Sequence, residues 1–168
     1  MHRLYAPWRS PYLQGEDMQG CVFCAISQAA HLDASNHVLY RDARVFVVMN
    51  RYPYNPGHFM VIPHQHVDSP ELLSLQDWQH LQKRIYEGVQ LLYAFGADGI
   101  NVGFNLKDAG GAGVSAHLHG HLVPRFYKDT NFISVIGDTR VYGVDFEAIY
   151  QELKEKGGSY FTPDEERA

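Results

Sequence analysis

The chain has 168 residues, 45% of them hydrophobic, which is enough for one compact domain and short for two. Its formal net charge of −5 disfavours partners that reward a basic surface, so we expect no nucleic-acid binding and no attachment to an anionic membrane. No segment approaches the roughly 18 apolar residues of a membrane span, and two cysteines are too few for a disulfide scaffold, so we expect a cytoplasmic protein.

Strand-forming residues gather in three runs in the first half of the chain. The runs at 37–41 and 44–50 are rich in β-branched and aromatic residues, and only residues 42–43 separate them, which predicts a tight hairpin. A loop with two prolines leads into the third run, at 58–63. The pattern predicts an antiparallel meander.

A long amphipathic helix is predicted next. Ser69, Pro70 and Glu71 have the composition of a helix start, with a capping hydroxyl, a proline at the first position and an acid near the positive end of the dipole. Apolar residues then recur at spacings of three and four, at Leu75, Trp78, Leu81, Ile85, Val89 and Leu92. The pattern ends near Phe95, with Gly96 as the stop.

The remaining elements complete an α+β fold. Residues 99–105 are predicted to form a fourth strand, and the segment from 117 onward a fifth. Apolar residues between 146 and 153 predict a second, short helix that ends at Gly157. We therefore expect an antiparallel five-stranded sheet with one long and one short helix.

The most informative motif is a row of three alternating histidines, His117, His119 and His121. On an extended strand this spacing places all three rings on one face. At about 3.3 Å per residue the outer two lie roughly 13 Å apart, too far to share one metal ion. The row therefore fits an extended substrate better, and a cluster of histidines can supply both a neutral nucleophile and a protonated partner near neutral pH.

A glycine-rich loop precedes the histidine row. The glycines at 110, 111 and 113 let backbone N–H groups converge on an anion, and Ser115 would share the face of the histidines if the strand starts there. Lys107 could add a positive charge. A glycine loop alone is often a plain turn, but beside three histidines it indicates a phosphate-bearing substrate.

This arrangement resembles the histidine triad (HIT) family, in which histidines alternate with mostly apolar residues. There the middle histidine attacks the α-phosphorus of a nucleotide, so the resemblance implies that His119 is the nucleophile and forms a nucleotidyl-histidine intermediate. It also implies that the backbone carbonyl of His58, in a Pro-Gly-His segment, holds the proton on the far side of the ring. His121 would contact phosphate oxygens, and Ser115 would donate to the leaving-group oxygen.

Further residues would bind the nucleotide. The resemblance places Asn50 at a nucleoside contact and Asn105 at a phosphate contact, although either alone could be a turn or strand-end residue. The remaining expected contacts to the nucleotide phosphates are Lys107, Gly111, Gly113 and Val114.

The resemblance also organises the chain. We expect an N-terminal arm at 1–20, a histidine triad domain at 21–126, and a C-terminal extension at 127–168 that packs on the domain. As in relatives, the protein would form a homodimer, with the arm wrapped over its own domain or over the partner subunit.

Two departures from the family pattern bear on the reaction. Many hydrolytic relatives carry glutamine where this chain has Gly113, and Gly120 replaces an apolar residue within the histidine row. The chain instead resembles a bacterial branch similar to diadenosine tetraphosphate (Ap4A) phosphorylases, in which inorganic phosphate accepts the nucleotidyl group and ADP and ATP are released. The alternatives are a hydrolase that releases AMP from dinucleoside polyphosphates or nucleoside phosphoramidates, and a non-catalytic nucleotide-binding or zinc-dependent interaction module.

Cys21 and Cys24 have the spacing of a metal or redox pair. Zinc prefers four thiolate or imidazole ligands, and in related proteins with the same cysteine pair it lies between residues that correspond to His66 and His117. The resemblance thus implies a structural zinc ion held by these four residues. The alternative is two reduced core cysteines. No magnesium ligand set is evident, so any magnesium would arrive with the substrate.

Overall fold

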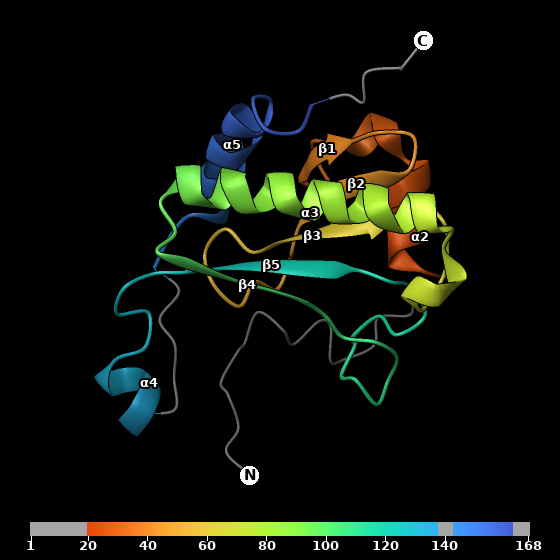
Figure 1. Ribbon diagram of the computed structural model, residues 1–168. Helices are drawn as coiled ribbons and strands as arrows, with labels where there is room; N and C mark the ends of the chain where they lie inside the picture. The colour runs from red at the N-terminus through yellow and green to blue at the C-terminus, as the bar shows by residue number, and fades with distance from the viewer. Residues whose placement is uncertain (1–19, 138–142, 163–168) are drawn as a thin grey trace.

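The computed structural model describes residues 20–137 and 143–162. Its centre is one antiparallel sheet in which the strands follow the order β1-β2-β3-β5-β4 (Figure 1). The strands are β1 (Val38–Arg41), β2 (Val45–Met49), β3 (Phe59–Pro63), β4 (Gly99–Phe104) and β5 (Gly120–Arg125). The expected α+β fold with an antiparallel five-stranded sheet is confirmed. The last strand of the described residues, β5, lies inside the sheet rather than at its edge.

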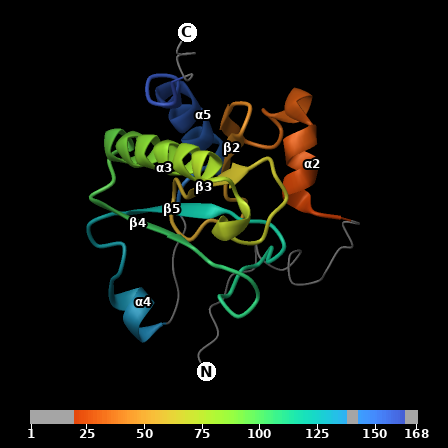
Figure 2. The same ribbon diagram turned by 45° about the vertical axis from the view of Figure 1, so that its right-hand side comes forward.

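Helices cover the sheet unevenly. The α-helices of the described residues are α2 (Val22–Gln28), α3 (Leu75–Phe95), α4 (Phe132–Ile136) and α5 (Phe146–Gly157), and the short 3-10 turns are η2 (Ala30–Leu32) and η3 (Pro70–Leu72). The long helix α3 and the C-terminal α5 lie on one side of the sheet (Figures 1 and 2). Both helices expected from the sequence are present. The sequence does not predict α2 or α4, because 7 and 5 residues are too few to establish a helical period.

The middle strands are buried on both faces. Every residue of β2 and β3 is buried, because alternate side chains enter two separate apolar clusters. Val45 and Val47 pack in the cluster that includes α3, whereas Phe46 and Val48 pack in a second cluster with Phe23 of α2. The short helix α2, which carries the cysteine motif, is therefore attached to the sheet by its own apolar side.

The predicted start of the long helix is wrong. The segment after Ser69 forms only the turn η3, and α3 begins five residues later with Ser74 as its N-cap. The Ser74 hydroxyl accepts the backbone N–H of Asp77 at 3.0 Å, whereas the side chain of Ser69 bonds Glu71 instead of a backbone group. Two serine-led starts compete here, and the one that caps a free N–H begins the helix. The end is as predicted, with Gly96 left-handed at φ 105°.

The predicted hairpin is confirmed, and its turn anchors a buried ionic network. Asp42 Oδ1 accepts the backbone N–H groups of Arg44 and Val45, which closes the turn. Its other oxygen accepts from Arg84 Nε at 2.9 Å and pairs with His80 at 2.8 Å. Arg84 thus joins the hairpin to α3.

The same guanidinium reaches two further groups. Arg84 Nη1 donates to Glu87 Oε2 at 2.8 Å and to the Thr162 carbonyl at 2.6 Å, so it also holds the end of the described chain. Its side chain is fully buried, whereas Arg44 and Asp77, which form an ion pair at 3.0 Å, are each 35% exposed. The two ion pairs of the buried Arg84 and the solvent-accessible pair of Arg44 thus lie in the same region of the described chain.

The C-terminal helix extends the core. Leu153 and Phe161 are buried in the cluster beneath α3, and Lys154 Nζ donates to the Val38 carbonyl at 2.9 Å. The helix α5 and Phe161 thus belong to the core of the described chain. The predicted N-terminal arm lies almost wholly outside the described residues. Within 20–137 and 143–162, none of the helices has the length and apolar character needed to cross a membrane.

We predict that Arg84→Met lowers the free energy of unfolding by about 3–5 kcal/mol, because it leaves the buried Glu87 and the partly buried Asp42 without the charge of Arg84. Arg44→Met is the matched control and should cost less than about 1 kcal/mol, since its pair is exposed to solvent. Urea unfolding of both variants measures the difference. Equal losses of unfolding free energy in the two variants would contradict the conclusion that burial makes the ion pairs of Arg84 more important for stability than that of Arg44.

Candidate active site and metal cluster

The histidine row is not a continuous strand. The strand β5 begins only at Gly120, which pairs with Phe104, the last residue of β4. His117 and His119 therefore precede the strand, and the prediction of three rings on one strand face is wrong. With β4 ended, Leu118 N donates to the Val67 carbonyl at 2.6 Å, a residue outside the sheet. The Nδ1 atom of His117 instead lies 3.3 Å from Cys21 Sγ and 3.6 Å from Cys24 Sγ.

His119 is held by the backbone of its own segment. Its Nδ1 lies 2.7 Å from the carbonyl oxygen of His117, so Nδ1–H donates and Nε2 keeps the lone pair. The expected acceptor, the carbonyl of His58, is wrong: that oxygen accepts the backbone N–H of Asn50 at 2.9 Å. The His119 side chain is 4% exposed, and burial lowers its pKa below the ordinary histidine value. The ring is therefore a neutral base with its basic nitrogen on the side away from His117.

His58 and His121 form a second, coupled pair. The backbone N–H of Tyr54 donates to His58 Nδ1 at 3.1 Å, which places the His58 proton on Nε2. His58 Nε2 lies 2.9 Å from His121 Nδ1 and donates to it, so the proton of His121 is on its own Nε2. That Nε2 is buried and has no hydrogen-bond partner among the described residues. The chain of donors ends in an unused N–H group.

Burial keeps both rings neutral, so the expectation of a protonated partner for the nucleophile is wrong. Desolvation is the main cause that lowers the pKa of His58 to about 3, and the neighbouring His121 is the next. Desolvation is also the main cause that lowers the pKa of His121 to about 4, and the neighbouring His119 is the next. The His119 and His121 ring centroids lie 4.9 Å apart. One neutral ring with a free lone pair thus stands beside another with a free N–H, and an anionic oxygen could satisfy the second.

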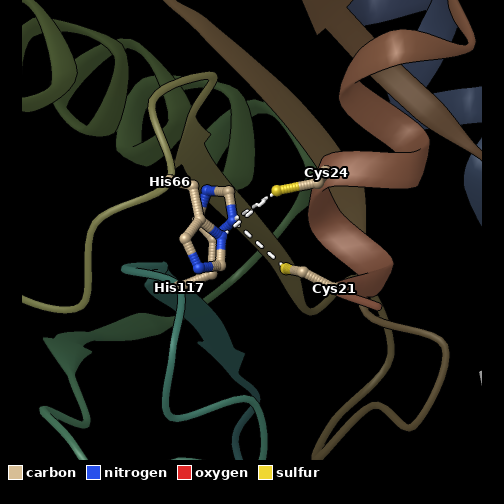
Figure 3. A group of neighbouring side chains, drawn as sticks. All are labelled: Cys21, Cys24, His66 and His117. Atoms are coloured by element: carbon tan, nitrogen blue, oxygen red, sulfur yellow. Dashed lines mark hydrogen bonds between the residues drawn. The ribbon is translucent and has the colours of Figure 1, made fainter. Parts of the chain in front are cut away.

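Four metal-ligating side chains meet next to this site (Figure 3). They are Cys21, Cys24, His66 and His117, and one ligand atom from each lies within 4.8 Å of all the others. His117 Nδ1 is 3.3 Å from Cys21 Sγ and 3.6 Å from Cys24 Sγ. His66 Nδ1 is 3.2 Å from Cys24 Sγ. The sequence-based grouping of these four residues agrees with their positions.

The donor set fits a tetrahedral zinc ion. Zinc bonds to sulfur and nitrogen of about 2.3 and 2.0 Å at tetrahedral angles imply a separation of roughly 3.6 Å between the two ligand atoms, close to the separations found here. His117 Nε2–H donates to the Pro63 carbonyl at 2.9 Å, which leaves Nδ1 unprotonated and pointed at the sulfurs. Partial desolvation and the adjacent Cys21 raise the pKa of the Cys24 thiol, which disfavours two neighbouring thiolates in the absence of a cation. A bound cation would stabilise both thiolates.

The expected nucleotide-binding asparagines lie at strand ends. Asn50 directly follows β2, its Oδ1 accepts the backbone N–H of Tyr52 at 2.9 Å, and its Nδ2 lies 3.3 Å from His58 Nε2. It is therefore beside the histidine pair. Asn105 directly follows β4 and is partly buried.

The glycine loop lies between β4 and β5, and its residues differ in their surroundings. Gly111 is exposed with a left-handed φ of 85°, and Gly113 is also exposed, whereas Val114 packs against the cluster of Phe23. Ser115 is partly buried. The described hydrogen bonds of His58, His119 and His121 include none of these loop residues.

The two cations that flank this loop are paired with carboxylates. Lys107 Nζ lies 3.8 Å from Asp68, and Arg125 makes a close ion pair with Asp129 at 2.6 Å. The Lys107 side chain is 58% exposed, so a phosphate could still attract it away from Asp68.

Gly120 has a packing role. A Cβ atom here would lie 2.8 Å from the Phe104 ring and 3.1 Å from Ile85, on the side of the sheet that α3 covers. The departure from the usual apolar residue at this position is therefore required by the close approach of Phe104. Gly120 therefore does not indicate whether phosphate or water accepts the nucleotidyl group.

Two aromatic residues of the site are not predicted by the sequence. Phe23 contacts both His117 and His119, with ring centroids 5.6 and 5.1 Å away. Tyr54 lies over His58 at 4.7 Å and over His121 at 6.0 Å. Each looks like an ordinary core or loop residue in the sequence, although the position of Tyr54 four residues before His58 is compatible with a turn that reaches its ring.

A family model for the HIT domain matches residues 31–128, which is more than half of the chain. The chain belongs to the histidine triad family. It is 33% identical over 149 residues to an AP-4-A phosphorylase of Mycobacterium tuberculosis, covering 84% of this chain and 76% of the relative. It is 32% identical over 111 residues to a bis(5'-adenosyl)-triphosphatase of Saccharomyces cerevisiae, covering 62% of this chain and 50% of that protein.

Solved structures agree on the fold. A zinc-bound histidine triad family protein of Mycobacterium smegmatis superimposes with a TM-score of 0.68 at 24% identity, covering 83% of this chain and 94% of that one. Because the named curated relatives are nucleotide-processing enzymes, the expectation of an enzyme of this family is also confirmed.

We predict that the free energy of unfolding falls as the pH drops from about 6.5 toward about 4. In this range the unfolded chain takes up protons at His58 and His121, whereas the folded protein keeps them neutral until pKa values of about 3 and about 4. Acid therefore favours the unfolded state. Urea unfolding at several pH values measures the slope.

The contribution of the pair can be separated from other groups by substitution. His121→Gln should flatten the dependence of unfolding free energy on pH, because it removes a ring that the unfolded chain protonates and the folded protein keeps neutral. His31→Gln, at an exposed position, should keep the wild-type slope. A wild-type slope in His121→Gln would contradict the assignment.

Proposed function

We propose that this protein is a nucleotidyl transferase that phosphorolyses dinucleoside polyphosphates, with Ap4A and inorganic phosphate giving ADP and ATP. The observation that carries the proposal is the hydrogen bond of 2.7 Å from His119 Nδ1 to the His117 carbonyl, which leaves Nε2 as a neutral nucleophile. The unused Nε2–H of His121, beside that ring, supports a phosphate oxygen as its partner.

The reaction would proceed by double displacement. In the first step, the His119 Nε2 lone pair attacks the α-phosphorus of Ap4A, an N–P bond forms, and the P–O bond to the rest of the substrate breaks to release ATP. In the second step, an oxygen of inorganic phosphate attacks the same phosphorus, and the N–P bond breaks to give ADP. Throughout, the proton on Nδ1 of His119 stays on that nitrogen and donates to the His117 carbonyl, and the His121 N–H stabilises the charge on a non-bridging oxygen.

The remaining assignments complete this proposal. Ser115 would donate to the leaving-group oxygen, Asn50 would contact the nucleoside, and Asn105 a phosphate. The other expected phosphate contacts are Lys107, Gly111, Gly113 and Val114. We further propose a cytoplasmic homodimer, a histidine triad domain at 21–126, and magnesium only as a companion of the substrate.

Phosphate is the preferred acceptor because the similarity to the AP-4-A phosphorylase spans 84% of this chain. The second candidate is a hydrolase that releases AMP, and the similarity to the yeast triphosphatase over 62% of the chain favours it. Both reactions share the first step. They differ in whether phosphate or water resolves the intermediate.

We also propose that Cys21, Cys24, His66 and His117 hold a structural zinc ion. When bound, zinc would link α2 to the segment before β5, with all four positions occupied by protein ligands and none open for substrate. The pairing of His117 Nε2–H with the Pro63 carbonyl supports this role, because a ligating histidine usually donates its other nitrogen in this way.

Incubation of the purified protein with Ap4A should give ADP and ATP only when phosphate is present. His119→Ala should lower kcat/KM by at least about 10³-fold, because the nucleophile is lost. Ion-exchange chromatography of the products measures both effects, and His31→Ala, at an exposed position, is the control. AMP formed without phosphate would favour the hydrolase. Full activity in His119→Ala would contradict the catalytic assignment.

Metal analysis should find one zinc ion per chain, and Cys24→Ser or His66→Gln should lose it, because each removes one of four ligands. Loss of the ion should lower Tm by about 5–10 °C, the effect of roughly 2–3 kcal/mol in a domain of this size. His64→Gln is the matched control, since this neighbouring histidine bonds Ser27 and the Asp42 carbonyl instead. Zinc retained in both ligand variants would contradict the site.

A further inference from the structure

The proton on His121 Nε2 depends on the loop that contains Tyr54 and Asn55, which lies outside the histidine row. Asn50 Nδ2 lies 3.4 Å from His58 Nδ1, but the nearest donor to this nitrogen is the backbone N–H of Tyr54 at 3.1 Å. The tautomer of His58, and through it that of His121, follows from this N–H. If that donor moved away, the His58 proton could transfer to Nδ1. His121 would then carry its proton on Nδ1 and present a lone pair to the substrate. A lone pair repels a phosphate oxygen that an N–H would bind.

The loop is held in place by Asn55. Its backbone carbonyl accepts the N–H of His58 at 3.1 Å, which closes the turn that brings Tyr54 N to the His58 ring. Its side chain is 4% exposed and points the other way, toward the far end of β5. There Nδ2 donates to the Pro124 carbonyl at 2.8 Å and to Asp129 Oδ2 at 2.9 Å. Both amide protons are therefore used to fix the loop.

Asp129 is itself firmly placed. Arg125 donates to both of its oxygens, at 2.6 and 2.8 Å, and the backbone N–H of Phe126 donates at 3.3 Å. The bidentate arginine, together with Asn55, lowers the pKa of Asp129 far below its usual value. The carboxylate therefore stays ionised and remains a strong acceptor for the Asn55 amide.

We propose that Asn55 and Asp129 are positioning residues that set the tautomer of His121 through the Tyr54–His58 turn. Asp129 lies one residue beyond the matched HIT domain, so the C-terminal extension completes the active site from outside the family core. The geometric part of this proposal is independent of the reaction. Its kinetic consequence rests on the proposed phosphorolysis.

The first test is the ring-nitrogen spectrum of the folded protein. Long-range proton–nitrogen NMR of the histidine rings should show protonated Nε2 and unprotonated Nδ1 at both His58 and His121 in the wild type at about pH 7.5. Asp129→Ala and Asn55→Ala should each lose this single state, with both nitrogens of each ring moving toward averaged shifts. Asp129→Asn should be intermediate, because it keeps an oxygen for Asn55 but loses the charge that holds Arg125.

A matched control uses another carboxylate on the same segment. Asp98 Oδ2 accepts the backbone N–H of Tyr127 at 2.6 Å, so Asp98→Ala also loosens this segment but leaves the Asn55 amide paired. It should keep the wild-type tautomers. Far-UV circular dichroism and Tm establish folding, and the partly exposed Asp129 variants serve if Asn55→Ala fails to fold.

Kinetics form the second test. Asp129→Ala should lower kcat/KM for Ap4A about 10- to 100-fold, mainly through kcat, whereas Asp98→Ala should stay within about twofold. Folded Asp129→Ala and Asn55→Ala variants with wild-type tautomers would overturn the positioning role. If the wild type does not turn over Ap4A, the proposed function fails, and the NMR comparison still decides the role of Asn55 and Asp129.

Discussion

The site depends on the hydrogen bond that the backbone carbonyl of His117 accepts from His119. This carbonyl accepts the Nδ1 proton of His119 at 2.7 Å, and the ring of the same residue points toward Cys21 and Cys24 on one side and donates to the Pro63 carbonyl on the other. Backbone and side chain cannot move independently at this position. Any shift of the cysteine cluster is therefore transmitted to the ring that would attack phosphorus.

Burial determines the chemistry of the remaining histidines. If the neighbouring histidines at 58, 117, 119 and 121 were protonated, their positive charges would attract phosphate. No ring would then keep a lone pair for nucleophilic attack. Desolvation instead holds His58, His119 and His121 neutral, so their roles follow from which nitrogen keeps the proton. Backbone groups make that choice: a carbonyl for His119 and the Tyr54 N–H for His58. Fixed dipoles of this kind need no reorganisation during the reaction.

Local patterns were informative where one signal dominated. Continuous runs of apolar, β-branched and aromatic residues predicted β2 and β3, and Gly96 predicted the end of α3, because few residues adopt its left-handed φ. The predicted start of α3 was wrong, since Ser69 and Ser74 both precede acidic residues and only Ser74 caps a backbone N–H, that of Asp77. The short helix α2 gave no periodic signal, although it carries the cysteine pair.

The sequence by itself determined the fold class, the family and the set of histidines and cysteines, because these follow from residue types at fixed short spacings. Only the tertiary structure decided that β5 lies between β3 and β4, that the His117 carbonyl rather than that of His58 holds His119, and that Asp129 reaches Asn55. These are contacts between residues far apart in the chain, or between backbone groups. A backbone carbonyl is the same in every residue, so no residue pattern can indicate which one a side chain will find.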